Sequence, residues 1–172
     1  MGVRQTYARQ VFQLQLVRPD HEAAILAFEE ANRAYFATSI SDRGDSYFAS
    51  FSEQHRELLA QQENGTAAFF VLADESGEVL GRFNLYEISA GTARVGYRVA
   101  ERAAGHGTAT SGLRQLCQKA RDTLGLLTLT GATSNENVAS QRVLRKAGFA
   151  YVGATVVGGR EGALFNLDLV VP

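Results

Sequence analysis

Two glycines one residue apart, Gly105 and Gly107, lie in the stretch RAAGHGTAT, between a strand-like segment and a helix-like one. Glycine at the mouth of a helix leaves the backbone N–H groups bare, and the first turn of a helix carries a partial positive charge. Unpaired amides at that positive end are a general site for phosphate groups. The stretch therefore predicts a ligand that carries phosphate, although the same glycines could simply make a tight turn into the helix.

Two common phosphate motifs do not fit this stretch. Gly107 and Gly112 have the spacing of a nucleoside-triphosphate loop, but Leu113 and Arg114 stand where lysine and then serine or threonine are required. A dinucleotide motif requires a third glycine, where this sequence has Thr110, and an acidic residue at the end of the next strand, which is missing here. Both nucleotide readings are therefore disfavoured.

A second polar motif, N-x-x-S at 137–140 followed by VLRKAGF, opens another helix-like segment after the next strand. Together with the R-x-x-G-x-G motif at 102–107, it resembles the acyl-CoA site of the GCN5-related N-acetyltransferase (GNAT) superfamily, in its ribosomal-protein N-terminal acetyltransferase-like branch. The resemblance covers residues 11–171, and its specific part is 79–149.

The resemblance implies an α/β (α+β) fold with a mixed, mostly antiparallel central sheet of about seven strands flanked by helices. Two parallel strands, expected at 93–100 and 126–132, would splay apart at the acyl-CoA site. The resemblance also implies acetyl-CoA as the cosubstrate, without a metal. The final strands of this superfamily often pair between subunits, which leaves a homodimer open.

The residues expected to contact acetyl-CoA come from the end of the first splayed strand, the glycine loop and the second motif. They are Val99, Ala100, Arg102, Gly105, His106, Gly107, Thr108, Ala109, Asn137, Ser140 and Arg145. A main-chain N–H near Val99 or Ala100 would polarise the acetyl carbonyl as it becomes an oxyanion. His106 is expected to project outward and to contact phosphate or solvent instead of transferring protons.

Amine attack on a thioester needs a neutral amine, an oxyanion donor and a proton for the departing thiolate. Many superfamily members carry a tyrosine near the sulfur, four residues before the glycine that ends the second helix, but this chain has Leu144 there. The resemblance to the branch implies that Ser140 hydrogen-bonds the departing sulfur and that Asn137 fixes the pantetheine arm. The alternative is that Ser140 lies on the helix surface and Asn137 only begins the helix.

The general base is less well defined. In the branch a carboxylate follows the second motif, but the matching stretch, VVGGRE at 156–161, has glycine near that position and leaves Glu161 as a displaced candidate. Glu87, at the end of a predicted strand, is the candidate we favour, and the alternative is that it is only an exposed strand-end residue. A chain of water molecules could also accept the proton.

The acceptor is expected to be a primary amine of a protein N-terminus, a peptide or a small molecule, selected by the N-terminal half. Acidic side chains there could attract an ammonium group, or could simply lie on the loop surface: Glu30, Asp42 and Asp45. Aromatic side chains could line an apolar cleft, or could belong to the core: Tyr35, Phe36, Tyr47 and Phe48. Because no base is evident and Leu144 replaces the usual tyrosine, the alternative function is a non-catalytic acyl-CoA binding module.

Composition limits the other function classes. With 172 residues and 45% apolar content, the chain is expected to form a single acyl-CoA N-acyltransferase domain over 1–172, with 1–10 as an N-terminal arm that could be flexible. The net charge of −1 predicts no nucleic-acid partner, although the segment 98–146 is locally basic. The single cysteine, Cys117, and the lack of a long apolar run predict a cytoplasmic protein without disulfides or membrane spans.

Hydrophobic periodicity predicts the order of elements. Strands are expected at 11–17, 67–74, 78–88, 93–99, 126–132, 150–157 and 163–171, and helices after Asp20 as N-cap, over 52–62, from 109 to about 124 and from 138 to 147. The strand at 126–132 has a nearly continuous apolar run and is expected to be buried on both faces.

Overall fold

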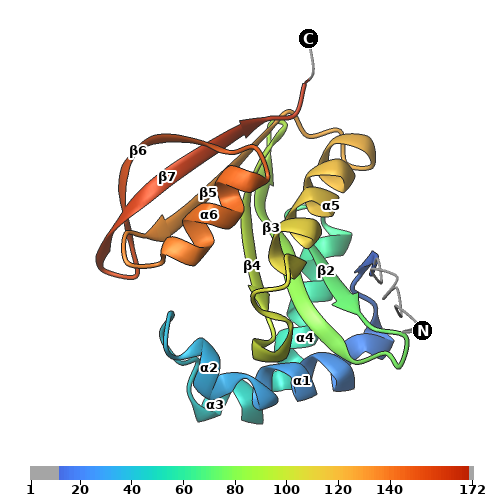
Figure 1. Cartoon of the computed structure of the whole chain (residues 1–172). Coiled ribbons are helices and arrows are strands. Elements are labelled where there is room, and N and C mark those ends of the chain that lie inside the picture. Colours follow the sequence, from blue (N-terminus) through green and yellow to red (C-terminus); the bar gives the residue numbers. More distant parts are fainter. Residues whose placement is uncertain (1–11, 171–172) are drawn as a thin grey trace, which may run out of the picture.

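The computed structural model describes residues 12–170, so the expected arm at 1–10 lies outside the described residues. The chain forms one seven-stranded sheet in the order β1-β2-β3-β4-β5-β7-β6 (Figure 1). The strands are β1 Leu14–Leu16, β2 Ala68–Ala73, β3 Val79–Ser89, β4 Thr92–Val99, β5 Thr128–Ser134, β6 Ala150–Val157 and β7 Arg160–Asp168. Each neighbouring pair is antiparallel except the parallel pair β4 and β5, which confirms the predicted mixed sheet.

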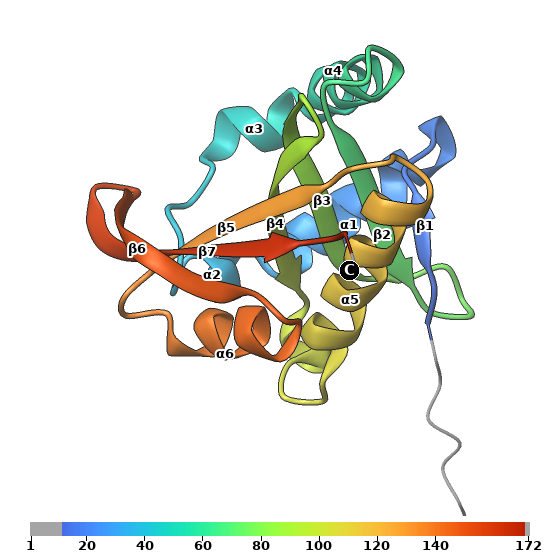
Figure 2. The same cartoon turned by 90° about the horizontal axis from the view of Figure 1, so that it is seen from above.

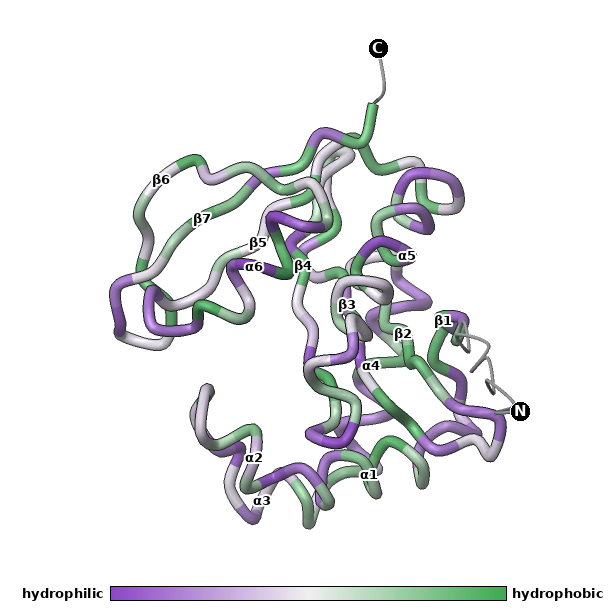
Figure 3. The backbone as a smooth tube through the Cα atoms, viewed as in Figure 1, coloured by the Kyte–Doolittle hydropathy of each residue, from purple (hydrophilic) through white to green (hydrophobic). Residues whose placement is uncertain are grey.

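Helices cover both faces of the sheet (Figures 1 and 2). On one face lie α5 (Thr108–Asp122) and α6 (Val138–Lys146), whose apolar side chains pack on β3, β4, β5 and β7. On the other face lie α1 (Glu22–Ala31), α2 (Arg33–Phe36), α3 (Asp45–Ala49) and α4 (Phe51–Glu63). Hydrophilic and hydrophobic residues alternate along α5 and α6, as expected for helices with one buried face (Figure 3).

Helix α5 approaches the sheet closely because a glycine faces the strand beneath it. A Cβ placed on Gly112 would lie only 2.1 Å from Cζ of Phe83, a fully buried residue of β3. The backbone of α5 therefore rests directly on the Phe83 ring, with Leu113 and Leu116 completely buried beside it. This contact fixes where the N-terminus of α5, and the glycine loop before it, stand relative to β4.

Strands β4 and β5 separate after a short parallel pairing. They pair only from Thr92 opposite Thr128 to Arg94 opposite Thr130. Beyond that point β4 continues along β3 as far as Val99, whereas β5 follows β7 as far as Ser134. The two strands form the arms of a V that opens toward the glycine loop (Figure 1), as the resemblance predicts.

The structure corrects several details of the predicted elements. Asp20 is not the cap of a helix, because Pro19–His21 form a 3-10 turn in front of α1 and the Asp20 carboxylate pairs with Arg18. Strand β5 is buried only at alternate positions, since Ala132 is exposed on the face where the N-terminal helices do not cover it. Strand β7 begins three residues earlier than predicted, because the Gly158-Gly159 turn is too short to leave a loop.

Candidate active site

The glycine loop leaves the first turn of α5 without a side-chain cap. Gly105 and Gly107 both have φ in the left-handed region, +76° and +78°, and Gly107 directly precedes the helix. No side chain accepts a hydrogen bond from the first-turn amides of α5, so these donors are available to a ligand. A Cβ on Gly105 would meet no heavy atom within 4 Å, which means that the space beside the loop is open.

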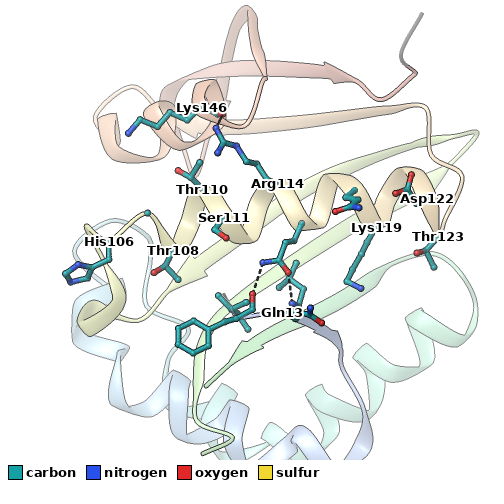
Figure 4. Close-up of a pocket in the computed structure, with 16 residues that line it drawn as sticks. Gln13, His106, Thr108, Thr110, Ser111, Arg114, Lys119, Asp122, Thr123 and Lys146 are labelled. Atoms are coloured by element: carbon teal, nitrogen blue, oxygen red, sulfur yellow. Dashed lines mark hydrogen bonds between the residues drawn. The ribbon is translucent and has the colours of Figure 1, made fainter. Parts of the chain in front are cut away.

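A groove of about 1070 Å³ runs from this loop along the outer side of α5 (Figure 4). Its lining residues come from α5, the loop, the start of β1 and the end of α6, and include His106, Gly107, Thr108, Thr110, Ser111, Arg114, Gln115, Lys119 and Lys146. The guanidinium of Arg114 donates to the main-chain oxygen of Lys146 at 2.7 Å and so joins α5 to the end of α6. Two cationic side chains, Arg114 and Lys146, therefore stand near the positive end of α5.

Two arginines expected at the phosphate site have their side chains elsewhere. Arg102 forms ion pairs with Glu78 at 3.0 Å and Asp74 at 3.4 Å, in the turn between β2 and β3. Arg145 lies over the ring of Phe165, 5.3 Å from its centroid, against β7. Neither side chain is among those that line the groove, and their expected phosphate contacts stay predictions. The cationic side chains that do line the groove include Arg114 and Lys146.

Of the two predicted oxyanion donors, one remains free to face the V. Ala100 donates its N–H to the carbonyl of Leu80 at 2.8 Å, and its side chain is buried on the opposite face of the sheet. Because donors alternate in direction along a strand, the N–H of Val99 points away from β3 and into the V. The expected role of Ala100 as a donor is therefore corrected, and for Val99 it stays a prediction.

The second motif forms the first turn of α6 beside the V. The side-chain oxygen of Asn137 accepts the N–H of Ser140 at 3.1 Å, so Asn137 does cap the helix. This bond uses the amide oxygen and leaves the NH₂ group to donate elsewhere. The hydroxyl of Ser140 lies 2.9 Å from the hydroxyl of Tyr97 on β4. Tyr97 was not singled out from sequence, although strand alternation places it on the same face as Val95 and Val99.

The two carboxylates considered as the base occupy different parts of the molecule. Glu87 is exposed at a bulge in the β3–β4 hairpin and pairs with Arg94 at 3.4 Å. Arg94 and Val99 are five residues apart on β4, or roughly 16 Å, so the structure does not bring Glu87 beside the proposed donor. Glu161 is exposed in the second position of β7, and its main-chain oxygen accepts the N–H of Asn135 at the end of β5.

Two of the acidic candidates of the N-terminal half, Asp42 and Asp45, are paired with one arginine. Asp42 accepts two hydrogen bonds from Arg33, at 2.9 and 2.7 Å, and Asp45 pairs with the same arginine at 2.8 Å. The hydrogen bonds from Arg33 hold the pKa of Asp42 below its usual value. Phe36 is a core residue. The expected attraction of an ammonium group by Asp42 and Asp45 stays a prediction, and both carboxylates already share Arg33 as a partner.

A buried ion cluster lies beneath these loops. Glu29 of α1 is 2% exposed and accepts hydrogen bonds from Arg82 at 2.7 Å and from Arg98 at 3.1 Å. Burial lowers the pKa of Arg98, against the opposing attraction of Glu29. One carboxylate thus holds two arginines from neighbouring strands, and Arg98 directly precedes Val99.

The described part of the chain has no cluster of side chains that could bind a metal ion, and its one cysteine is buried. Within residues 12–170, no group of three or more histidine, cysteine or acidic side chains is placed to hold a metal ion. Cys117 is buried on α5, and burial raises the pKa of its thiol to about 12. The same residues include no helix that is both long enough and apolar enough to cross a membrane.

Comparison with protein-family models finds one match, to the acetyltransferase (GNAT) domain, over residues 12–150. A search of curated protein sequences finds no match. Among solved structures, the chain is similar to the ribosomal-protein-S5-alanine acetyltransferase from Vibrio fischeri, with a TM-score of 0.85, 18% identity, and coverage of 92% of this chain and 93% of that one.

Two further structures share the fold. One is RimJ from Mycobacterium smegmatis in complex with CoA-disulfide, with a TM-score of 0.80, 22% identity, and coverage of 90% of this chain and 80% of that one. The other is spermidine N-acetyltransferase from Vibrio cholerae in complex with CoA and spermine, with a TM-score of 0.76, 17% identity, and coverage of 92% and 96%. At these identities the likeness describes the fold.

Proposed function

The chain belongs to the acetyltransferase (GNAT) domain family, and on this premise we propose that it moves an acetyl group from acetyl-CoA to a primary amine of a protein N-terminus, a peptide or a small molecule by direct attack in a ternary complex. As a family member it is an acetyl-CoA-dependent N-acetyltransferase. The observation that carries the proposal is the V between β4 and β5, whose mouth is the uncapped N-terminus of α5.

The residues at the mouth of the V fit the diphosphate of CoA. The amides that follow Gly105 and Gly107 donate from a positive helix end, and the open space at Gly105 lets a phosphate approach the backbone. Arg114 and Lys146 add positive charge on the groove side. Since backbone amides do most of the binding here, the site needs glycine more than it needs any particular side chain.

Inside the V, the chain supplies donors at two points of the reaction. Val99 directs its N–H to the acetyl carbonyl, whose oxygen gains negative charge as the amine attacks. Ser140 directs its hydroxyl to the sulfur, which gains negative charge as the C–S bond breaks. Because a thiolate is a fair leaving group, most of the rate enhancement comes from positioning the two reactants.

The acceptor side lies where α2 and α3 approach the β6–β7 hairpin (Figure 1). Glu161 is an exposed carboxylate next to the turn of this hairpin, and it is the candidate base for the attacking amine. If Glu161 accepts the proton, Glu161→Gln lowers kcat/KM by about a hundredfold or more at neutral pH. Glu136→Gln is the matched control, because Glu136 is also exposed there and pairs with Arg160. Unchanged kcat/KM in Glu161→Gln would leave the proton to water.

The decisive experiment combines binding with turnover. The purified chain is titrated with acetyl-CoA by calorimetry and then assayed for thiol release with a panel of peptides, polyamines and amino acids. Gly105→Ala is expected to weaken acetyl-CoA binding at least tenfold. Gly65→Ala is the control, because Gly65 has a similar φ of +73° and equally open surroundings but lies at the end of α4. Equal binding by both variants would contradict the proposed donor site, and binding without thiol release for any amine would contradict the transfer.

The sheet edge also offers a place for two chains to pair. Strand β6 is the last strand of the sheet, and Val152 and Val156 on it are 55% and 70% exposed. An exposed edge strand with apolar side chains is a ready surface for association. Light scattering is expected to give the mass of a dimer for the native chain and of a monomer for Val156→Lys. A monomeric native chain would contradict the pairing.

A further inference from the structure

A hydrogen bond joins the two sides of the V next to the proposed sulfur position. The hydroxyl of Tyr97, from the middle of β4, lies 2.9 Å from the hydroxyl of Ser140 and 3.2 Å from the main-chain oxygen of the same residue on α6. Strands β4 and β5 are no longer paired at the level of Tyr97. The tyrosine therefore reaches across the opening that the substrate arm is proposed to occupy.

The position of Tyr97 is well determined by its surroundings. Its ring stacks on the ring of Phe83, with the centroids 6.0 Å apart and the planes inclined by 16°. Phe83 is fully buried and lies directly under Gly112 of α5, so the tyrosine packs on a residue that is held between the sheet and the helix. Burial raises the pKa of the Tyr97 hydroxyl, the hydrogen bond with Ser140 opposing this effect, so it stays protonated and can always donate.

The two hydroxyls can arrange their hydrogen atoms in two ways. In the first, Tyr97 donates to the main-chain oxygen of Ser140 while the Ser140 hydroxyl donates to Tyr97. In the second, Tyr97 donates to the Ser140 hydroxyl oxygen, and the serine hydrogen is free to point into the V. A thioester sulfur is a weak acceptor and a thiolate is a strong one, so the second arrangement becomes favourable as the C–S bond breaks.

We propose that Tyr97 is a positioning residue that acts through Ser140: by donating to the serine oxygen, it turns the serine hydrogen toward the departing sulfur. The inference rests on the proposed function, since it assumes that CoA sulfur reaches the V. The C–S electron pair goes to sulfur, the amine nitrogen gives one proton to the base, Glu161 or water, as the amide forms, and sulfur takes one proton from water. Tyr97 loses none.

This pairing accounts for a feature of the sequence that the superfamily pattern leaves open. Leu144 stands where many members carry a tyrosine, and here it is a core residue that is 1% exposed against Gly131. The phenol that contacts α6 comes from Tyr97 on β4 instead. A strand tyrosine and a helix serine together supply one oriented donor.

The first test uses CoA itself and needs no acceptor. Bound CoA thiol is titrated by the ultraviolet absorbance of its thiolate, in the native chain and in Tyr97→Phe, Ser140→Ala and Tyr86→Phe. The proposal expects the bound thiol in Tyr97→Phe and in Ser140→Ala to ionise at higher pH than in the native chain, by about half a unit to one unit, the size of one hydrogen bond to a charged acceptor. Tyr86→Phe is the control, because it also removes a hydrogen-bonded phenol, 2.8 Å from Asn84 on β3, but on the other face.

The second test is a double-mutant cycle on kcat. Ser140→Ala is expected to lower kcat about tenfold, Tyr97→Phe about threefold to tenfold, and the double variant no further than Ser140→Ala, with the KM for acetyl-CoA unchanged throughout. Additive losses, or an unchanged thiol ionisation in Tyr97→Phe, would overturn the role of Tyr97 while leaving the transferase intact. Failure of the native chain to bind CoA would overturn the proposed function as well, and thermal unfolding of each variant checks that it is folded.

Discussion

The two faces of the sheet bury different kinds of residue. Beneath α5 and α6 the core is apolar, built on side chains such as Phe83, Leu113 and Phe165. Beneath α1–α4 the buried set includes Glu29 and Arg82, and with them Asn32, His55 and Asn84. The face that holds the proposed donor site therefore relies on shape and backbone amides, whereas the other face relies on specific pairs of charged and polar groups.

A single polar link shows that the second face also supports the first. The side-chain oxygen of Asn32, at the end of α1, accepts the N–H of Glu101 at 3.0 Å, and its amide nitrogen donates to Phe28. Glu101 begins the 3-10 turn that leads from β4 into the glycine loop. The buried Asn32 of the N-terminal helices thus helps to hold the entrance of the loop in place.

Removing the carboxylate of Glu29, which Arg82 and Arg98 share, should lower the free energy of unfolding more than any other change considered below. Glu29→Gln leaves Arg82 and Arg98 buried without a counter-charge, which costs about 3–5 kcal/mol of unfolding free energy. Urea unfolding at neutral pH measures the loss. Glu30→Gln changes the next residue of α1, which is exposed, and should be nearly neutral. Similar losses in both variants would remove the contrast between the two faces.

The second largest loss of unfolding free energy is expected where a side chain is added at the close contact between Gly112 and Phe83, on the apolar face. In Gly112→Ala the new methyl group would meet the Phe83 ring at 2.1 Å, so α5 must shift. Because the contact is so close, we take the overpacking cost at the upper end of about 1–3 kcal/mol; less the roughly 1 kcal/mol gained from helix propensity, this leaves a loss of up to about 2 kcal/mol. Urea unfolding measures it, and Gln118→Ala on the exposed side of α5 is the control. Adding Phe83→Leu should recover part of the loss; if it does not, the ring is not the obstacle.

The cationic side chains of the groove should contribute less to CoA affinity than the backbone shape of the glycine loop. Lys146→Gln removes a cation near the N-terminus of α5 and is expected to weaken CoA binding about threefold to fivefold, the size of an exposed ion pair, with a smaller effect at high salt. Lys119→Gln removes a cation farther along the same helix and should change binding little. Calorimetric titration measures both affinities. A larger effect at Lys119 would move the phosphates toward the other end of the groove.

Most of the fold could be predicted because its signals are local. An apolar run at 67–74 and the turn signal after it predicted the hairpin of β2 and β3, and the apolar stripe at 109–124 predicted α5, which the structure has at Thr108–Asp122. The V follows from the resemblance and not from periodicity. Elements that depend on tertiary packing could not be predicted from local patterns. The short helix α3 is an example: no local pattern predicts it, and in the structure its Tyr47 packs edge-on against Phe51 of α4.

The candidate site divides in the same way. The glycines of the loop could be found in the sequence because a backbone with positive φ, as at Gly105 and Gly107, favours glycine over other residues. Arg102 and Arg145 could not be placed, because an arginine side chain is long enough to pair with whichever acid or ring the fold brings near it. Tyr97 was missed because its partner is 43 residues away, and only the folded chain brings the two hydroxyls together.

The smallest predicted effect lies on the exposed side of the polar face and separates surface pairs from the buried cluster. Arg33 holds the pKa of Asp42 below 3.8, so the ionised carboxylate adds stability above that pH, and this contribution is lost as the pH falls through the lowered pKa of the folded state. Thermal unfolding should therefore show Asp42→Asn slightly less stable than the native chain near neutrality, with the difference shrinking below about pH 3.8. In an Arg33→Gln background the same substitution should change little, because its partner is gone. A difference that stays constant into acid would mean that Asp42 acts through its turn at Gly44 and not through charge.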